Sequence, residues 1–297
     1  MRFDEAFSGW TRASFISPEA WRLPYRDDHG TLAAHALERL ADGPGFAVVT
    51  GVPVSAMDSA EVRAFSESML GHLGRPLPQG VGRETALAWL VRDEGVSAYT
   101  DDRRFHESAF TSKSRGWLHL HNDQAVQPFG HEPDYLALLA HRKARSGGET
   151  VLVDAWSVYQ VLRREFPREL DRLQQPFPID RRHVTPEGAD QVVWSPVFEP
   201  GGGGLRVRCN VKRIETAFLL TGSTPPSADL AALDALQHVL DRADLRLTLM
   251  LEEGDCLLID DRRVLHGRTG YEDHQALGRR RCLVRVMLTQ HPCGGTD

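Results

Sequence analysis

Apolar and polar positions alternate along most of this chain, and the spacing predicts mainly β-structure. Several stretches combine β-branched or aromatic residues with flanking glycine, proline or asparagine, which is typical of short strands. We predict strands at residues 45–51, 86–91, 117–121, 135–141, 150–153, 191–198, 205–209, 245–251, 256–259 and 282–289. So many short strands favour a β-sandwich or a β-barrel.

Apolar residues recur at helical spacing in other segments, which predicts helices between the strands. In the first of these, Leu32, Ala33, Leu37 and Leu40 would share one face before the chain turns at Gly43. We predict helices at residues 29–42, 59–73, 156–165, 167–174 and 228–243. The glycines at 201–204 predict a turn between two strands. The organisation is therefore antiparallel β-structure with helical insertions, in one domain rather than two.

The composition is that of an ordinary globular protein. Of the 297 residues, 41% are hydrophobic and 26% are charged, and the formal net charge is −6. A mildly acidic chain repels nucleic acid, so we expect no nucleic-acid partner. The amino terminus lacks the apolar run of a secretory signal, and no stretch is long enough to span a membrane. Four cysteines without a CxxC pair are typical of reduced thiols, and we expect a cytoplasmic protein.

Two separated segments contain the candidate chemistry of the chain. In the segment His121-Asn122-Asp123, residues two apart on a strand face the same side, so His121 and Asp123 can point into one cavity. His266 follows the predicted strand that runs from Gly254 into a polar turn, and it offers a third ligand. Two imidazoles and one carboxylate cover one face of an octahedral metal, which is how non-haem Fe(II) oxygenases hold iron.

Groups that could bind an anion accompany both segments. Thr150 follows the glycines of the sequence GGET at the start of a predicted strand. Arg281 and Arg285 are four apart on the last predicted strand, so their side chains would face the same way. Burying a guanidinium without an anion costs several kcal/mol, whereas a carboxylate could pair with it. For Arg279 and Arg280 we expect a solvated turn.

These motifs, in this order, resemble the TauD/TfdA family of Fe(II)- and 2-oxoglutarate-dependent dioxygenases, which is related to clavaminate synthase. The resemblance rests on HND, GGETVLVD, GDCLLIDDRRVLHGR and RRRCLVRVML, and it covers residues 117–154 and 254–290. It implies a double-stranded β-helix, or jelly-roll, core flanked by α-helices. The expected single domain, 1–297, would have an α/β preface at about 1–90 and a core at about 91–297, with a helical insert at about 155–245.

The resemblance also implies roles for individual residues. His121, Asp123 and His266 would bind Fe(II), while Thr150 and Arg281 would hold the distal carboxylate of 2-oxoglutarate. Arg285 would contact either the cosubstrate or an anionic group of the substrate. Asp261 stands where the family often has Asn, a difference that we expect to affect turn geometry rather than metal binding.

The implied reaction uses O2 and 2-oxoglutarate to oxidise, most simply to hydroxylate, an unactivated C–H bond, with release of succinate and CO2. We expect the partner to be a small-molecule substrate, either an amino acid or an intermediate of secondary metabolism, and we leave assembly into a homo-oligomer open. Candidate residues of the substrate pocket are Leu90–Arg92, Phe105–Phe110, Arg206–Asn210 and Arg285. Candidate lids lie within residues 92–115 and 180–203.

Other classes of function stay open at this point. The segment His119-Leu120-His121-Asn122-Asp123 resembles the start of a dinuclear zinc hydrolase motif, with His183 as a later ligand. That motif requires histidine at position 124, which is Gln124 here. A cupin site would need a glutamate at position 125 or 126, which hold Ala and Val. A non-catalytic jelly-roll binding protein would be expected to have lost one of the three ligands.

Overall fold

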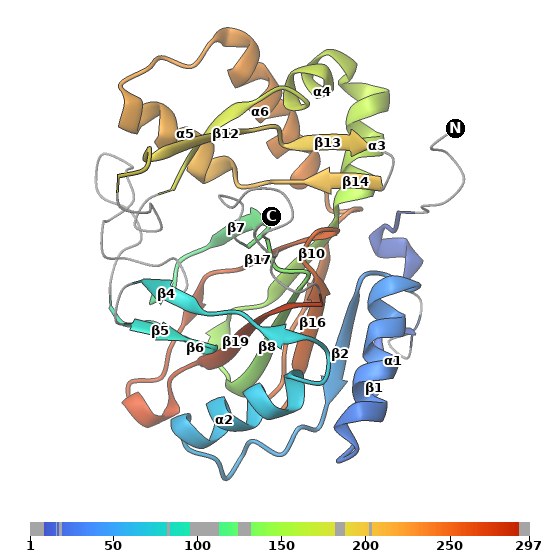
Figure 1. Ribbon diagram of the computed structural model, residues 1–297, viewed down its shortest axis with the longest axis vertical. Helices are drawn as coiled ribbons and strands as arrows, with labels where there is room; N and C mark the ends of the chain where they lie inside the picture. The colour runs from blue at the N-terminus through green and yellow to red at the C-terminus, as the bar shows by residue number, and fades with distance from the viewer. Residues whose placement is uncertain are drawn as a thin grey trace.

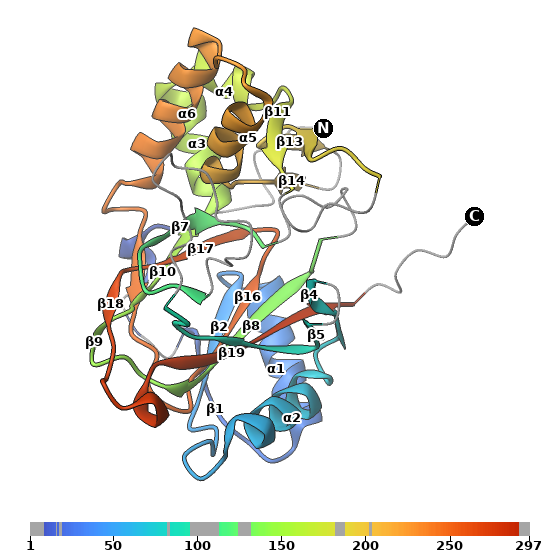
Figure 2. The same ribbon diagram turned by 90° about the vertical axis from the view of Figure 1, so that its left-hand side faces the viewer.

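Two β-sheets packed face to face form the centre of the molecule (Figures 1 and 2). The computed structural model describes residues 9–15, 17, 20–81, 84–95, 113–123, 132–181, 188–201 and 204–290. The larger sheet has the strand order β1-β2-β16-β8-β19-β3, with β6 also paired to β19. Its strands are β1 (Arg22–Pro24), β2 (Phe46–Thr50), β3 (Arg75–Pro76), β6 (Ala88–Val91), β8 (Tyr135–Arg142), β16 (Cys256–Asp260) and β19 (Cys282–Thr289).

The smaller sheet has the order β15-β10-β17-β7, and its strands are antiparallel. They are β7 (Leu118–His121), β10 (Thr150–Asp154), β15 (Leu247–Leu249) and β17 (Val264–Arg268). Short pairs of strands extend this framework. They are β4 (Gln79–Val81) with β5 (Glu84–Ala86), β9 (Ser146–Gly147) with β18 (Tyr271–Glu272), β11 (Phe177–Asp180) with β12 (Val192–Ser195), and β13 (Phe198–Gly201) with β14 (Gly204–Val207).

Helices cover the sheets in two groups. The helices α1 (His29–Ala41) and α2 (Ser59–Leu70) pack on the outer face of the larger sheet. The helices α3 (Ala155–Glu165), α4 (Pro167–Leu173), α5 (Val211–Thr221) and α6 (Ser227–Leu240) form a separate layer with β11–β14, above the sheets in Figure 2. The chain therefore folds as a β-sandwich with one helical layer below it and one above it.

Alternation along the strands divides the apolar residues between the layers. In β8, Leu136 and Leu138 point into the space between the sheets, whereas Ala137 and Leu139 pack against α1 and α2. Because both faces of this sheet are covered, its central strands are continuous apolar runs rather than alternating ones.

The same alternation determines where the polar residues of the smaller sheet lie. Leu152 and Val264 belong to the apolar core between the sheets, whereas Val153 and Leu265 belong to the cluster under the helical layer. Thr150 shares the parity of Leu152, and His266 shares that of Val264. The strands therefore direct these polar side chains into the sandwich.

The sequence-based expectation of a β-sandwich with helical insertions is confirmed, and so are most of its elements. The strand predicted at 191–198 is wrong in extent: β12 ends at Ser195 and β13 begins at Phe198. Pro196 lies between them and lacks the N–H that a continuous ladder needs. Helix α5, at Val211–Thr221, was not predicted. Its first turn is capped by Asn210, which accepts a hydrogen bond from the backbone of Arg213.

Two local expectations near the candidate site are also corrected. His266 lies within strand β17, not at the end of the preceding strand, because a turn at Asp261–Arg263 returns the chain into the smaller sheet. Strand β7 ends at His121, so Asp123 lies in the turn that follows rather than on the strand. Arg281 directly precedes β19, and a register shift at Cys282 and Leu283 separates it from the regular part of that strand.

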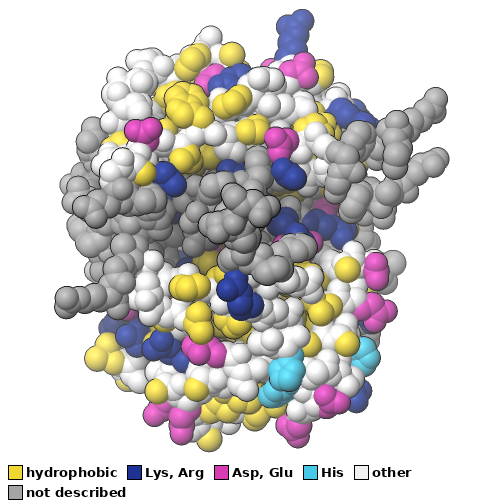
Figure 3. Space-filling view, in the orientation of Figure 1, with side chains coloured by type: hydrophobic (Ala, Val, Ile, Leu, Met, Phe, Trp, Pro, Cys, Tyr) yellow, Lys and Arg dark blue, Asp and Glu magenta, His cyan; other side chains and the backbone are white. Residues whose placement is uncertain are grey.

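The surface shown in Figure 3 has acidic and basic side chains interspersed, with hydrophobic side chains scattered among them. Within the described ranges, every helix is too short or too polar to cross a bilayer.

Candidate active site

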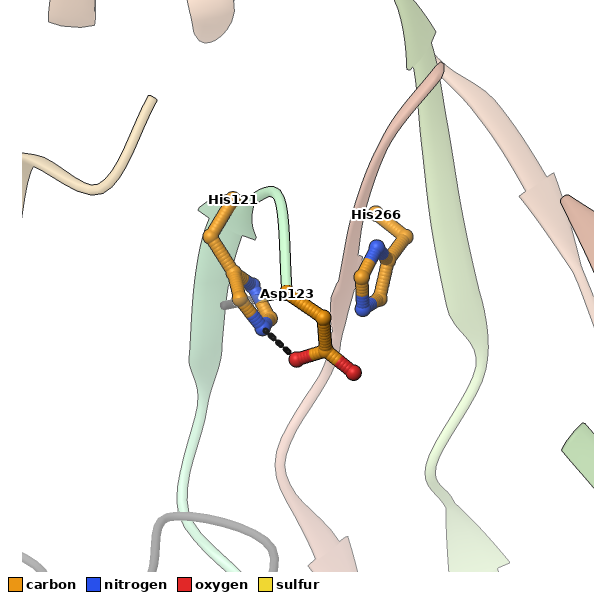
Figure 4. A group of neighbouring side chains, drawn as sticks. All are labelled: His121, Asp123 and His266. Atoms are coloured by element: carbon orange, nitrogen blue, oxygen red, sulfur yellow. Dashed lines mark ion pairs between the residues drawn. The ribbon is translucent and has the colours of Figure 1, made fainter. Parts of the chain in front are cut away.

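Three side chains of one cluster meet between the sheets. His121, Asp123 and His266 are buried, and each offers a ligand atom within 4.8 Å of those of the other two. His121 and His266 are paired in the register of β7 and β17, which brings their rings to a centroid separation of 4.4 Å. Figure 4 shows the three side chains pointing toward one another, with Asp123 between the imidazoles. Oδ1 of Asp123 lies 3.6 Å from Nε2 of His121.

A backbone contact orients the imidazole of His121, and burial affects the pKa of His266. The Nδ1 atom of His121 lies 2.8 Å from the carbonyl oxygen of His119. In the tautomer that donates this hydrogen bond, Nε2 has a free lone pair on the side of Asp123. Burial lowers the pKa of His266 and outweighs the opposite effect of Asp123, so its ring is neutral at pH 7.

An arginine keeps the carboxylate ligand ionised. Burial alone would raise the pKa of Asp123, but the Arg285 guanidinium, with His121 and His266, lowers it below its usual range. Nη1 of Arg285 lies 3.1 Å from Oδ2 of Asp123, and its Nε donates to Oε1 of Gln79 at 2.7 Å. Asp123 therefore presents a negative charge beside the two imidazoles.

Asn122 ties the turn that contains Asp123 to two other segments of the chain, at Asp261 and at Cys209. The Asn122 side chain donates to the carbonyl oxygen of Asp261 and accepts from the backbone N–H of Cys209 at 3.0 Å. Its own N–H donates to the carbonyl of Cys209 at 3.1 Å. The side chain that points away from the cavity thus fixes the turn between the two ligands.

The donor set fits a divalent iron ion. Two imidazole nitrogens and one carboxylate on adjacent elements can occupy one face of an octahedron, and the ligand atoms are close enough to reach one ion. His121, Asp123 and His266 would hold the ion, and all three line one pocket.

That pocket brings together all the residues that the sequence predicted to bind the metal or the cosubstrate. Thr150, Arg281 and Arg285 line it together with the three ligands, and apolar walls are supplied by Val91, Leu118, Leu138 and Leu283. Arg268, which was not among the candidates, also lines it.

Two further arginines, Arg268 and Arg281, make one end of the pocket strongly cationic. Arg268 and Arg281 are 5% and 4% exposed, and both guanidinium groups lie over the ring of Tyr271, at 4.8 and 5.0 Å from its centroid. Burial and the charge of Arg281 lower the pKa of Arg268 to about 10. Burial likewise lowers the pKa of Arg281. This end of the pocket therefore fits an anionic group.

The glycines of the GGET motif make room for Arg281. Gly148 has φ +84°, and a Cβ atom there would lie 3.2 Å from Nε of Arg281 and 3.4 Å from Cβ of Tyr271. Gly147 has φ +72°, and a Cβ atom there would lie 2.4 Å from the carbonyl oxygen of Gly270. Both positions need glycine for backbone conformation and for space.

The candidate substrate-pocket residues have different outcomes. Val91 lines the pocket, whereas Leu90 and Arg92 line a separate surface hollow. Cys209, within the candidate segment Arg206–Asn210, is hydrogen-bonded to Asn122 beside the metal ligands. Phe105–Phe110 lie outside the described residues, as do His183 and most of the first candidate lid.

Sequence reasoning missed two side chains that complete the site. Asp261 is 2% exposed, and its Oδ2 accepts a hydrogen bond from the backbone N–H of Asp123 at 2.9 Å, so its role extends beyond the turn. Arg268 shares the parity of His266, two residues earlier on β17. This shared facing could have identified Arg268 as a site residue, but only if His266 had been predicted to lie inside a strand.

Comparison with known protein families finds a match across most of the chain. The model of the "Taurine catabolism dioxygenase TauD, TfdA family" matches residues 11–287. A uridine-5'-phosphate dioxygenase of Streptomyces sp is 31% identical over 265 residues, which are 84% of this chain and 86% of that protein. The FR-33289 synthase of Streptomyces rubellomurinus (strain ATCC 31215) is 26% identical over 247 residues, 83% of this chain and 68% of that protein.

Solved structures with the same fold include two iron oxygenases. An asparagine oxygenase in complex with Fe(II), (2S,3S)-3-hydroxyasparagine and succinate has a TM-score of 0.64 at 17% identity, covering 91% of this chain and 94% of that one. The non-heme iron oxygenase OrfP in complex with Fe and alpha-ketoglutaric acid has a TM-score of 0.62 at 20% identity, covering 88% and 80%. The expected jelly-roll core flanked by helices is confirmed by this likeness.

Proposed function

Because the chain belongs to the TauD/TfdA family, and is therefore an Fe(II)- and 2-oxoglutarate-dependent dioxygenase, we propose that it hydroxylates an unactivated C–H bond of a small molecule at the pocket beside His121, Asp123 and His266. The observation that carries this proposal is that the three ligands and the cationic end lie in one pocket. Family membership favours this activity over a zinc hydrolase and over a non-catalytic binding protein.

In this proposal His121, Asp123 and His266 hold Fe(II). When bound, Fe(II), 2-oxoglutarate and O2 supply the oxidising chemistry, in which the keto acid yields succinate and CO2. Thr150 and Arg281 hold the distal carboxylate of 2-oxoglutarate, as their place at the cationic end of the pocket permits. Arg285 orients Asp123 and presents its remaining N–H groups to an anionic group of the cosubstrate or of the substrate. The apolar walls limit the access of water.

We propose an amino acid or a natural-product intermediate as the substrate. The names of the relatives support this class: one acts on uridine-5'-phosphate, and the asparagine oxygenase is complexed with a hydroxylated amino acid. The charge of Arg285 supports a substrate with an acidic group, provided that the cosubstrate leaves it accessible.

A cytoplasmic location and a single-domain organisation complete the proposal. Cys209, Cys256 and Cys282 are buried free thiols, which suits a reducing compartment. Strands β1 and β2 of the amino-terminal preface are part of the larger sheet, which supports one folding unit. Cell fractionation tests the location, and a single cooperative unfolding transition tests the organisation. Light scattering would determine whether the enzyme forms a homo-oligomer.

Turnover tests the proposed function. The iron-loaded protein would be supplied with 2-oxoglutarate, O2 and a panel of amino acids and nucleotides that includes uridine-5'-phosphate. We expect succinate release to rise with the true substrate and the product to gain one oxygen atom from 18O2. His266→Ala would abolish both signals. Folded, iron-loaded protein that shows no visible charge-transfer band with 2-oxoglutarate and releases no succinate with any member of the panel would contradict the proposal.

A further inference from the structure

Arg268 lies directly opposite Thr150 in the smaller sheet. The two are partners in the antiparallel register of β10 and β17, and both line the pocket. Side chains of directly opposed residues share one face, with Cβ atoms about 5 Å apart. Whatever Thr150 binds therefore lies within reach of the Arg268 side chain.

Hydrogen bonds hold the Arg268 guanidinium in place and leave part of it unpaired. Nη2 donates to the carbonyl oxygens of Ser114 and Gly116, at 2.8 and 2.7 Å. Nε and Nη1 are buried without a hydrogen-bond partner in the described part of the chain. The same is true of Nη1 of Arg281. Both guanidinium groups thus offer donors that the described part of the chain does not satisfy.

The charges at this place are also unbalanced. Among the described residues, neither Arg268 nor Arg281 has a carboxylate within ion-pair distance, although both are buried against Tyr271. Two buried cations without an anion are costly, and a bound carboxylate would both balance the charge and accept the unpaired N–H groups.

We propose that Arg268 binds the distal carboxylate of 2-oxoglutarate together with Arg281 and Thr150, so that two guanidinium groups recognise this end of the cosubstrate. The proposal rests on the proposed function of the pocket. It makes Arg268 a residue that selects keto acids with a second carboxylate. A purely structural Arg268 would only fix residues 114–116 and would not distinguish one keto acid from another.

Two keto acids separate these roles. 2-Oxoglutarate and 2-oxobutanoate have the same metal-binding head, but only the first has a distal carboxylate. Each would be titrated anaerobically into the Fe(II)-loaded protein, and the visible charge-transfer band would report its dissociation constant. The variants are Arg268→Met, Arg268→Lys, Arg281→Met and the double Met variant. Arg246→Met is the matched control, because the Arg246 guanidinium, like that of Arg268, donates to a backbone carbonyl. Its Nε donates to the carbonyl oxygen of Leu240 at 2.7 Å.

We expect Arg268→Met to weaken 2-oxoglutarate binding by roughly 10- to 100-fold, as for a lost hydrogen bond to a charged group. Binding of 2-oxobutanoate should change by less than about twofold, and Arg268→Lys should retain part of the selectivity. The effects of the Arg268 and Arg281 substitutions should not be additive, because both act on one carboxylate. Equal weakening of both keto acids, or no weakening of either, would overturn the assignment. If neither keto acid gives a band with the wild-type protein, the proposed function itself fails.

Discussion

The carboxylate of Asp261 accepts a hydrogen bond from the backbone N–H of Asp123, with 2.9 Å between Oδ2 and the nitrogen. Its other oxygen, Oδ1, lies 3.4 Å from Nδ1 of His266. One buried carboxyl group therefore lies beside two of the three metal ligands, hydrogen-bonded to Asp123 and close to His266 without a hydrogen bond between them. Such outer carboxylates fix the orientation of a ligand ring and its tautomer.

Replacement of Asp261 should weaken metal binding more than it weakens folding. We expect Asp261→Asn to lower the affinity for Co(II), used as an air-stable substitute, by roughly 10- to 100-fold. The amide can still accept from Asp123, but it cannot offer a second oxygen to His266. Asp255→Asn is the matched control, because Asp255 is also buried and accepts from a backbone N–H, that of Glu252, at 3.1 Å. Equal Co(II) affinities in the two variants would contradict this role.

Removal of Arg285 should make metal binding more sensitive to acid. Arg285 lowers the pKa of both Asp123 and His266, so Arg285→Gln should raise both values. Protons then compete with the metal at a higher pH. We expect the pH below which the Co(II) affinity falls to rise by about one unit, while the affinity at pH 8 changes little. Arg246→Gln is the control, and an unchanged pH dependence in Arg285→Gln would argue against the electrostatic role.

Gly148 should be needed for space as well as for conformation. Gly51 and Gly148 have φ of +81° and +84°, but an added Cβ atom at Gly51 would meet nothing within 4 Å. We expect Gly51→Ala and Gly148→Ala each to reduce the free energy of unfolding by about 1–2 kcal/mol. Only Gly148→Ala should also weaken 2-oxoglutarate binding, because it displaces Arg281. Urea unfolding and cosubstrate titration check the two effects, and unchanged cosubstrate affinity in Gly148→Ala would contradict the proposed packing.

Asn122 should matter for stability although it faces away from the pocket. Asn122→Ala removes two buried side-chain hydrogen bonds, to the backbones of Cys209 and Asp261. We expect a loss of about 2–3 kcal/mol in the free energy of unfolding, since the backbone groups left behind are buried. Denaturant unfolding of the metal-free protein measures it. A loss below about 0.5 kcal/mol, which is usual for surface substitutions, would show that the turn does not depend on this side chain.

The sequence predicted the parts of the fold that local patterns determine. The apolar runs that became β8 and β19 and the periodicity of α1 and α2 were sufficient, because burial of these elements follows directly from their spacing. The site candidates His121, Asp123 and His266 were chosen from spacing and motif order, and the structure brings them together in one cluster.

Features that depend on pairing between distant segments could not be predicted in this way. Arg268 joins the pocket through the register of β17 with β10, and Asp261 reaches Asp123 across 138 positions of the chain. The short strand β17 has a histidine, a glycine and an arginine in place of an apolar run, so local propensity did not reveal it. Helix α5 was missed although Val211, Ile214 and Phe218 have helical spacing and are buried beside β11.

The proposed site is tested most directly by an anaerobic titration of the protein with Fe(II) and 2-oxoglutarate, monitored by the visible charge-transfer band of the chelated keto acid. We predict a band in the wild-type protein and in His35→Ala, which replaces an exposed histidine of α1. We predict no band in His266→Ala and weaker 2-oxoglutarate binding in Arg281→Ala. A folded, iron-loaded wild-type protein without the band, or a band that persists unchanged in His266→Ala, would contradict the proposed site.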